Sequence, residues 1–500
     1  MSQPTLFSTR AARTAALLVI FVAAFAIRLY DLNDPPLDFH PTRQLLSAIK
    51  ARALYYRTKP EGIPLERIET GIRQAKLKAQ IEPVILEHLV AFTYRYTGEQ
   101  VWVARIYSSL FWLIGGAFLF MLVRDLLSFD AALVSTAYYL FFPYAIIASR
   151  SFQPDPLMVA LILGFWWSFW RWMQSPSWAK AILAGLLGGF AIFIKFSAAF
   201  FVIGAALGLG LSQYSWRDLF RNGQVWLMAI LGALPGTIYL INGVFIEGGL
   251  GDQFRGRFVP ALLLNPYNYL QWSVKVDLAA GGFFIMLGLL GFFLTTDRRL
   301  RRLMLGLWSA YLLYSLFFNY HVATHDYYHL PFIPIVALSL GPLGGWLMAR
   351  VAETTVPGIQ RSVVYLILIA GMFMVLWNVR NQMKVMDYRS EAAMWTEIGE
   401  LMDGKSVIAL VQDYGSRLEY WGWMTVPTWP HTGDPLYARI RDNEVRFEEM
   451  FVDYASRKDY FLVTDLDELE QQEQLKDRLK GYPVYMQGNG FMIFNMRESN

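Results

Sequence analysis

Cysteine is absent from the 500 residues, and charged residues are scarce. Without thiols the chain can form neither a disulfide nor a cysteine-ligated zinc site, so any metal would have to be bound by histidines and carboxylates. Charged side chains make up 17% of the sequence, against about 25% in soluble proteins. The net charge is only +4, and no stretch interleaves Lys and Arg with aromatic residues. We therefore expect no nucleic-acid partner.

Hydrophobic residues take the place of the missing charges and make up 55% of the chain. A helix needs about 20 apolar residues to cross a hydrocarbon core of about 30 Å. The fold class expected is therefore a polytopic α-helical membrane protein. Apolar runs predict eleven transmembrane helices, at residues 14–30, 102–123, 131–148, 157–173, 179–194, 197–212, 224–243, 275–294, 303–319, 330–348 and 362–379.

Lysine and arginine are distributed unequally between the two sets of short loops. Cytoplasmic loops are enriched in these residues, so the richer set marks the cytoplasmic side. The N-terminus is thus expected in the cytoplasm and the C-terminal tail outside a cell (inner or plasma) membrane. A cleaved signal ending at Ala24-Phe25-Ala26 is a less favoured alternative, because its loss would leave an even number of helices. The richer set holds Arg10, Arg13, Arg124, Arg171, Lys180, Arg217, Arg221, Arg298, Arg299, Arg301, Arg302, Arg350 and Arg361.

Two regions are too polar to lie in the membrane. The outer loop 31–100 has amphipathic stretches at 43–57 and 66–80, which are typical of interfacial helices. We assign this loop to a membrane module of residues 1–385, and residues 386–500 to an extracytoplasmic soluble α/β domain. Gly488-Asn489-Gly490 predicts a hairpin turn in that domain. Its strand-like runs are 407–411, 460–463 and 491–495, and its helix-like runs are 437–457 and 466–480.

Three carboxylates fall on the predicted outer face. Asp38 follows two prolines just after the first helix, Glu82 precedes Pro83, and Asp155 stands between Pro154 and Pro156. An acid beside a membrane is costly unless it faces water, a partner or a ligand. For each of the three, a helix N-cap or compensation of a helix dipole is the alternative. Because all three are predicted on the same face of the membrane, we favour a shared polar surface there.

Four cations belong to the same face: Arg150, Lys195, Arg255 and Arg257. Cations facing carboxylates at one membrane surface suit an anionic lipid headgroup and a polar second substrate. The alternatives are a surface salt-bridge network and, for Lys195, a side chain that extends along the helix into solvent.

The outer loop 319–331, which is rich in aromatic residues and histidines, leads into the tenth predicted helix. It holds three of the six histidines, and His325 and His329 have the i, i+4 spacing at which one helix face can bind a metal. There is no glutamate between them as in a helical HExxH motif. Anchoring of the tyrosines at the membrane interface is the favoured alternative.

The ordered set of these motifs resembles the GT-C glycosyltransferases, in the bacterial branch that is similar to protein O-mannosyltransferases and the lipid A aminoarabinose transferase. Each motif is short, so the resemblance rests on their order and side across residues 10–350. The matching pieces are Asp38, Glu82-Pro83, Ser149-Arg150, Pro154-Asp155-Pro156, Lys195 and the run His325-Asp326-Tyr327-Tyr328-His329-Leu330-Pro331.

The resemblance implies transfer of a sugar from a polyprenyl-phosphate donor to a protein, lipid or glycan acceptor on the outer membrane face. Asp38 would be the general base or would orient the acceptor hydroxyl, and Asp155 would support that site. Lys195, together with an outer arginine among Arg150, Arg255 and Arg257, would hold the carrier phosphate.

Further donor- or acceptor-binding residues implied by the resemblance are Glu82, His40, His325, Tyr327 and Tyr328. A divalent metal is the cofactor that the resemblance allows, with Glu82 as its candidate ligand. Many relatives have Asp-Glu where this chain has Asp38-Phe39-His40, and the outer loop 244–268 has no histidine to match the metal ligand of the aminoarabinose transferase.

Two other function classes compete with the transferase. A transporter or flippase would require charges near the bilayer midplane or repeated broken helices, and the sequence shows neither. A scaffold could bind glycans through aromatic residues at 420–423 and at Trp429, although such residues more often form a core.

Overall fold

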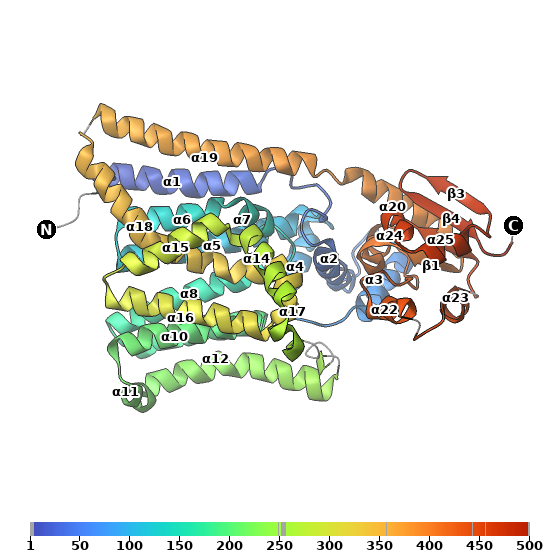
Figure 1. The fold of residues 1–500 in the computed structure, drawn as a ribbon, viewed down its shortest axis with the longest axis horizontal. Coiled ribbons are helices and arrows are strands. Elements are labelled where there is room, and N and C mark those ends of the chain that lie inside the picture. Colours follow the sequence, from blue (N-terminus) through green and yellow to red (C-terminus); the bar gives the residue numbers. More distant parts are fainter. Residues whose placement is uncertain are drawn as a thin grey trace. The chain divides into compact units, whose positions relative to one another are not determined.

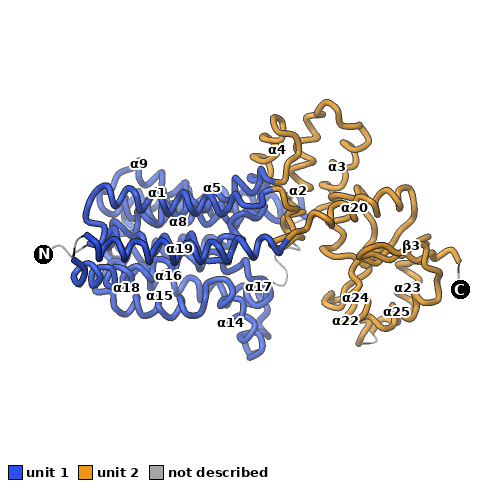
Figure 2. The backbone as a smooth tube through the Cα atoms, turned by 90° about the horizontal axis from the view of Figure 1, so that it is seen from above, with its two compact units in different colours: residues 1–32, 79–86, 102–386 blue, residues 33–78, 87–101, 387–500 orange. Residues whose placement is uncertain are grey.

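The computed structural model describes residues 5–248, 250–251, 257–356, 358–442, 444–455 and 457–498. The chain forms two compact units (Figure 2). The first contains residues 1–32, 79–86 and 102–386, and the second contains residues 33–78, 87–101 and 387–500. The predicted boundary at residue 385 lies one residue before the division at Met386. Most of the loop 31–100, which we assigned to the membrane module, packs with the C-terminal residues instead.

The first unit is entirely helical in its described part, and its long helices run side by side (Figure 1). Helix α9 packs against α8 and α12, and α10 packs against α16. The α-helices are α1 (Arg10–Arg28), α5 (Trp102–Leu126), α6 (Phe129–Phe141), α7 (Pro143–Ala148), α8 (Asp155–Gln174), α9 (Trp178–Ile194), α10 (Ala198–Gln213), α11 (Trp216–Arg221), α12 (Gly223–Ile241), α14 (Pro266–Ala280), α15 (Gly282–Leu294), α16 (Arg298–Phe317), α17 (Asn319–Thr324), α18 (Ile333–Thr354) and α19 (Ile359–Val385). Three further turns are a π-helix η1 (Asn242–Ile246) and 3₁₀ helices η2 (Pro260–Leu264) and η3 (Asp326–Phe332).

Two helices predicted as continuous are broken. The predicted helix 131–148 divides at Phe142 into α6 and α7, because Pro143 has no backbone N–H to continue the α6 hydrogen-bond ladder. The predicted helix 275–294 bends by 84° between α14 and α15. Gly281 lies at that bend with a φ of 72°, a left-handed conformation that glycine adopts without a Cβ clash.

The apolar helices support a multi-pass membrane protein. Among the described residues, five helices are long and apolar enough to cross a membrane, or six if the bent pair α14 and α15 counts as one span. The eleven spans expected from the sequence therefore remain a prediction. Helices α9 and α10 are apolar but shorter.

Glycines allow α10, which lines the cavity described below, to pack closely against α16. A Cβ on Gly204 of α10 would lie 2.7 Å from the carbonyl oxygen of Gly306 on α16, and a Cβ on Gly208 would lie 2.5 Å from that of Arg302. Such small-residue contacts let membrane helices approach backbone to backbone.

The second unit combines helices with one sheet. The sheet order is β1-β2-β4-β3, with β1 parallel to β2 and the other pairs antiparallel. Its strands are β1 (Val407–Leu410), β2 (Tyr460–Val463), β3 (Val484–Gly488) and β4 (Phe491–Asn495). Its helices are α2 (Pro41–Tyr56), α3 (Leu65–Leu77), most of α4 (Ile85–Thr97), α20 (Arg389–Met402), the 3₁₀ helix η4 (Gln412–Gly415), α21 (Ser416–Trp421), α22 (Pro435–Arg441), α23 (Phe447–Ala455), α24 (Leu466–Gln471) and α25 (Glu473–Leu479).

The α/β character expected of the C-terminal residues is present. The three predicted strands are β1, β2 and β4, and the turn at 488–490 joins β3 to β4. Each predicted long helix is instead two short helices, α22 with α23 and α24 with α25. Two apolar clusters cover the sheet, one around Trp429 and one around Trp395, and both indoles are fully buried.

Candidate functional site

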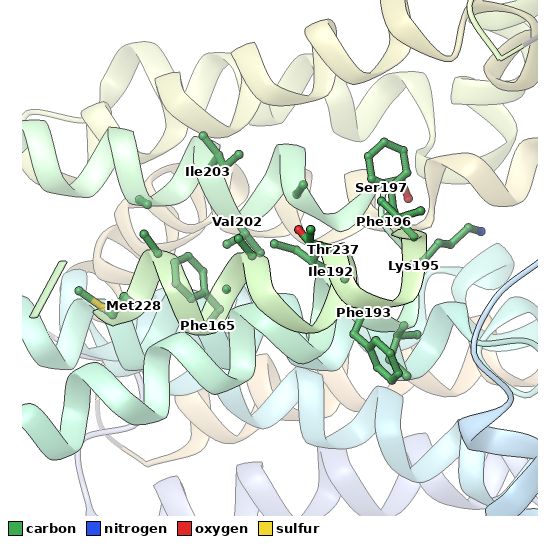
Figure 3. A pocket seen from close by; sticks show the side chains of 18 of the residues that line it. Phe165, Ile192, Phe193, Lys195, Phe196, Ser197, Val202, Ile203, Met228 and Thr237 are labelled. Atoms are coloured by element: carbon green, nitrogen blue, oxygen red, sulfur yellow. The ribbon is translucent and has the colours of Figure 1, made fainter. Parts of the chain in front are cut away.

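A cavity of about 620 Å³ lies in the first unit among helices α8, α9, α10 and α12. Most of its lining is apolar, and Figure 3 shows Phe165, Val202 and Met228 along this part. Several lining side chains, among them Ile203 and Trp226, are about half exposed. The cavity is therefore an open groove and not an enclosed chamber.

One end of this groove is polar. Lys195, the residue that follows α9, reaches outward there in Figure 3. Glu82, Arg257 and Tyr328 line the same cavity. Because α9 and α10 meet at residues 195–197, the turn between them places the lysine at the helix ends instead of within an apolar span. The groove thus combines a long apolar wall with cations at one end.

Lys195 forms an ion pair with Asp155, whose Oδ1 lies 2.9 Å from the lysine Nζ. Asp155 is 1% exposed, and its second oxygen, Oδ2, accepts no hydrogen bond from the residues that the structure describes. The alternative of an N-cap is wrong for Asp155, because Pro154 occupies the N-cap position of α8 and no side chain caps that helix. Lys195 is likewise buried, so the alternative of a solvent-extended lysine is also wrong.

Two tyrosines complete the environment of the ammonium group. The Lys195 Nζ lies 5.0 Å from the ring centre of Tyr327 and 5.1 Å from that of Tyr328, which is the geometry of a cation–π interaction. Arg257 donates from Nη1 to the Tyr328 hydroxyl at 3.1 Å. Tyr314 donates to the backbone carbonyl of Tyr328 at 3.0 Å. Three separate segments of the chain, around Lys195, Arg257 and residues 314–328, therefore contact one another here.

The histidine pair at 325 and 329 is not arranged for metal binding. His329 lies in the 3₁₀ helix η3, whereas His325 precedes that helix in an extended conformation, so the two side chains do not share a helix face. Both ring nitrogens of His329 are engaged, Nδ1 with the Tyr311 hydroxyl at 2.8 Å and Nε2 with the Val322 carbonyl at 2.9 Å. Nδ1 of His325 lies 2.7 Å from the Thr324 hydroxyl. The metal pair considered from the spacing is therefore wrong.

His321 belongs to the same cluster, although the sequence did not single it out. Its ring lies 5.1 Å from that of Tyr328 and 5.9 Å from that of His325. Its Nδ1 is buried and has no hydrogen-bond partner among the described residues. Burial, followed by the nearby charges of Arg257, His325 and Lys195, lowers the pKa of His321 to about 4. The imidazole is therefore neutral at physiological pH.

The remaining predicted cations lie elsewhere or outside the described residues. Arg150 is buried and does not line the cavity. It donates to the Asp31 carbonyl at 2.9 Å and contacts the Met383 sulfur at 2.8 Å. Arg255 lies outside the residues that the structure describes. No group of three histidines, aspartates and glutamates that could hold a metal occurs in the described part of the chain.

Asp38 and His40 belong to the second unit. Oδ1 of Asp38 accepts a hydrogen bond from Nε2 of Gln44 at 3.1 Å. Asp38 is not the N-cap of α2, because His40 occupies that position with a φ of 46°. The aromatic residues considered for glycan binding are largely covered: Trp429 is fully buried, and Trp423 stacks on Tyr56 with Arg52 over its ring.

Comparison with known proteins gives two kinds of match. Residues 82–241 match the family model described as dolichyl-phosphate-mannose-protein mannosyltransferase. No curated protein matches the sequence. Among solved structures, the chain is similar to ArnT from Cupriavidus metallidurans bound to undecaprenyl phosphate, with a TM-score of 0.58 and 14% identity over 96% of both chains.

The archaeal oligosaccharyltransferase AglB from Archaeoglobus fulgidus is also similar. Its complex with an inhibitory peptide and a dolichol-phosphate matches with a TM-score of 0.54 and 11% identity, over 95% of this chain and 72% of that one. A structure of the Archaeoglobus fulgidus oligosaccharyltransferase with zinc and sulfate matches with a TM-score of 0.53 and 12% identity, over 96% and 73% of the two chains. At such identities the matches establish a shared fold.

Proposed function

We propose that this chain, a GT-C glycosyltransferase of the ArnT and protein mannosyltransferase type, moves a sugar from a polyprenyl-phosphate donor to an acceptor on the outer face of the membrane. The family predicted from the sequence is confirmed by the family-model match and the structural neighbours. The lipid-linked donor, the acceptor and the reaction on the outer face are what we propose.

The observation that carries the proposal is the shape and polarity of the groove in the first unit. An open apolar wall suits a polyprenyl tail, and Lys195 and Arg257 at one end suit its phosphate. A soluble sugar nucleotide would not need the apolar wall. The ArnT and AglB structures contain undecaprenyl phosphate and a dolichol-phosphate, respectively, which supports a lipid-linked donor here.

The residues around Lys195 suggest how the phosphate is held. Asp155 fixes the direction of the ammonium group, so that little reorientation is needed when the anion arrives. Tyr328 accepts a hydrogen bond from Arg257, which leaves its own hydroxyl proton to donate to a phosphate oxygen. Both cations then stabilise the negative charge that increases on the phosphate as it departs.

The proposed reaction is a direct displacement at the anomeric carbon. The acceptor hydroxyl oxygen forms a bond to that carbon while the bond to the phosphate oxygen breaks, and its electron pair leaves with the polyprenyl phosphate. The hydroxyl proton passes to a base, for which the sequence predicts Asp38. We expect inversion at the anomeric carbon. No group of three or more metal-ligating side chains occurs among the described residues, and no step is routed through a metal.

The test is release of the carrier phosphate by purified protein in lipid nanodiscs. Donors would be a panel of polyprenyl-phosphate sugars, with protein, lipid and glycan acceptors and with or without chelator. We expect at least one donor to release polyprenyl phosphate in step with sugar transfer. Loss of activity with chelator would assign a metal, with Glu82 as the first ligand to test. Uptake of a substrate into vesicles without any glycosylated product would overturn the proposal in favour of a transporter.

A further inference from the structure

The segment that carries Asp38 is held by the first turn of helix α2. Nε2 of Gln44 donates both to Oδ1 of Asp38 at 3.1 Å and to the carbonyl oxygen of Phe39 at 2.7 Å. His40 joins the two parts with a left-handed φ of 46°, and Pro41 begins the helix. Any shift of the start of α2 would therefore move the Asp38 carboxylate with it.

The start of α2 is in turn bonded to a C-terminal loop of the same unit. The hydroxyl of Thr42 donates to Oδ1 of Asp413 at 2.9 Å. Asp413 lies in η4, just after strand β1, and its other oxygen pairs with Nε of Arg417 at 2.6 Å. Arg417 also forms an ion pair with Glu391 of α20. Thr42 and Arg417 thus hold the two oxygens of the Asp413 carboxylate, and Glu391 holds Arg417 in turn.

The backbone of this loop holds two consecutive residues in a strained conformation. Asp413 and Tyr414 are both left-handed, each with a φ of 52°. Side chains disfavour that region, and such residues persist only where their surroundings determine them; they also concentrate at functional sites. The Asp413 side chain, bonded to Thr42 and Arg417, holds the first of these two residues in place.

A second clamp holds the other end of α2. Arg52 is buried, pairs with Glu99 at 2.8 Å, and donates to the Tyr420 carbonyl of α21 at 2.7 Å. The Tyr420 hydroxyl donates to Glu99 at 2.8 Å. Helix α2 is consequently attached to the C-terminal residues near its first and its last turn, and it cannot pivot about a single contact.

We propose that the C-terminal residues act as a positioning element for Asp38, with Asp413 and Thr42 as the positioning residues. The inference rests on the proposed role of Asp38 as the base. The hydrogen bond from Thr42 to Asp413 sets where α2 begins, and Gln44 transmits that position to the Asp38 carboxylate. A base must lie within hydrogen-bond reach of the proton that it accepts, so small displacements cost rate without changing donor affinity.

Thr42→Val and Thr42→Ser form the matched test. Valine has nearly the shape of threonine but no hydroxyl, whereas serine keeps the hydroxyl. We expect Thr42→Val to lower kcat about tenfold with the KM for the donor unchanged, and Thr42→Ser to restore most of the rate. Asp459→Asn is the control in the same unit, because it removes only the surface pair of Asp459 with Arg497.

Hydrogen–deuterium exchange of the peptide around residues 37–45 gives a readout independent of activity. We expect faster exchange there in Thr42→Val than in wild type or in Asp459→Asn, with similar melting temperatures. Wild-type exchange and kcat in Thr42→Val would overturn the inference. If exchange responds as expected but wild type transfers no sugar from any donor, the positioning stands and the proposed function fails.

Discussion

At the scale of single residues, the pair of Asp155 and Lys195 must be tested without leaving a lone buried charge. Removing one partner of a buried ion pair costs about 3–5 kcal/mol, so Lys195→Met alone confounds binding with stability. We therefore predict that the double variant Asp155→Asn with Lys195→Met remains folded but binds the donor about 10- to 100-fold more weakly, as expected for a lost charged hydrogen bond. Binding of a radiolabelled polyprenyl phosphate measures this change.

Lys180 provides the matched control for that variant. It lies in the first turn of the same helix, α9, and its ammonium group bonds to Ser175, away from Asp155. Lys180→Met should bind the donor like wild type. Equal affinity in the double variant and in wild type would show that the ion pair serves only the fold.

His321 gives a prediction for the pH dependence of stability. Its pKa is about 4 in the folded protein, against an ordinary value of 6.5 in the unfolded chain. Between these values the unfolded chain binds the proton and the folded chain does not, so the contribution of His321 to stability falls as the pH drops from 6.5 toward 4. We expect His321→Asn to reduce the fall in melting temperature between about pH 7.5 and about pH 5. An equal fall in both proteins would contradict the buried neutral imidazole.

The sequence indicated several of the residues that the structure brings together at the candidate site, but not their pairing. Lys195 and Asp155 could be recognised as candidates because charged side chains beside apolar helices are costly unless they face water, a partner or a ligand. That they contact each other could not be predicted, because 40 residues and two helices separate them. His321 was overlooked, since its neighbours Tyr328 and Arg257 meet it only in the folded chain. Arg150 fitted the expected face as well, but it does not line the cavity and contacts Met383 of α19 and the Asp31 carbonyl.

At the scale of secondary structure, apolar length predicted where helices occur but not where they break. The break before Pro143 follows from local chemistry and could have been anticipated. The bend at Gly281 depends on the rings of Phe142 and Phe284, which would lie about 3.1 Å from a Cβ at that position. Glycine is common in apolar helices, so the sequence alone does not show which glycine bends a helix and which one lies at a helix contact.

Gly204 tests the close contact between α10 and α16. Its Cβ would lie 2.5 Å from that of Ala310 and 2.7 Å from the Gly306 carbonyl oxygen, so Gly204→Ala should force the helices apart at a cost of about 1–3 kcal/mol. Gly371→Ala in α19 is the control, because a Cβ there meets nothing within 4 Å. Thermal unfolding in detergent measures the difference. A melting temperature as high in Gly204→Ala as in Gly371→Ala would mean that α10 and α16 move apart freely.

At the scale of the whole molecule, composition determined the membrane class but not the division of the chain. We assigned the polar loop 31–100 to the membrane module because its amphipathic stretches are typical of interfacial helices. Its helices α2 and most of α4, with α3, instead belong to the second unit, where Ile68 is buried and Tyr56 stacks on Trp423. A surface complementary to an amphipathic helix cannot be located from one sequence, because the partner residues lie more than 300 positions away.

The orientation derived from the arginines can be tested cleanly because the chain has no cysteine. Arg301 and Gln471 are exposed, the first in α16 and the second at the end of α24. Positive-inside loops place Arg301 in the cytoplasm and residues 386–500 outside. We therefore expect Gln471→Cys to react with a membrane-impermeant maleimide in intact cells, and Arg301→Cys to react only after permeabilisation. The wild-type chain provides the unlabelled background in the same cells. Labelling of Arg301→Cys first would reverse the orientation and place the carboxylates and cations of the proposed site on the cytoplasmic face.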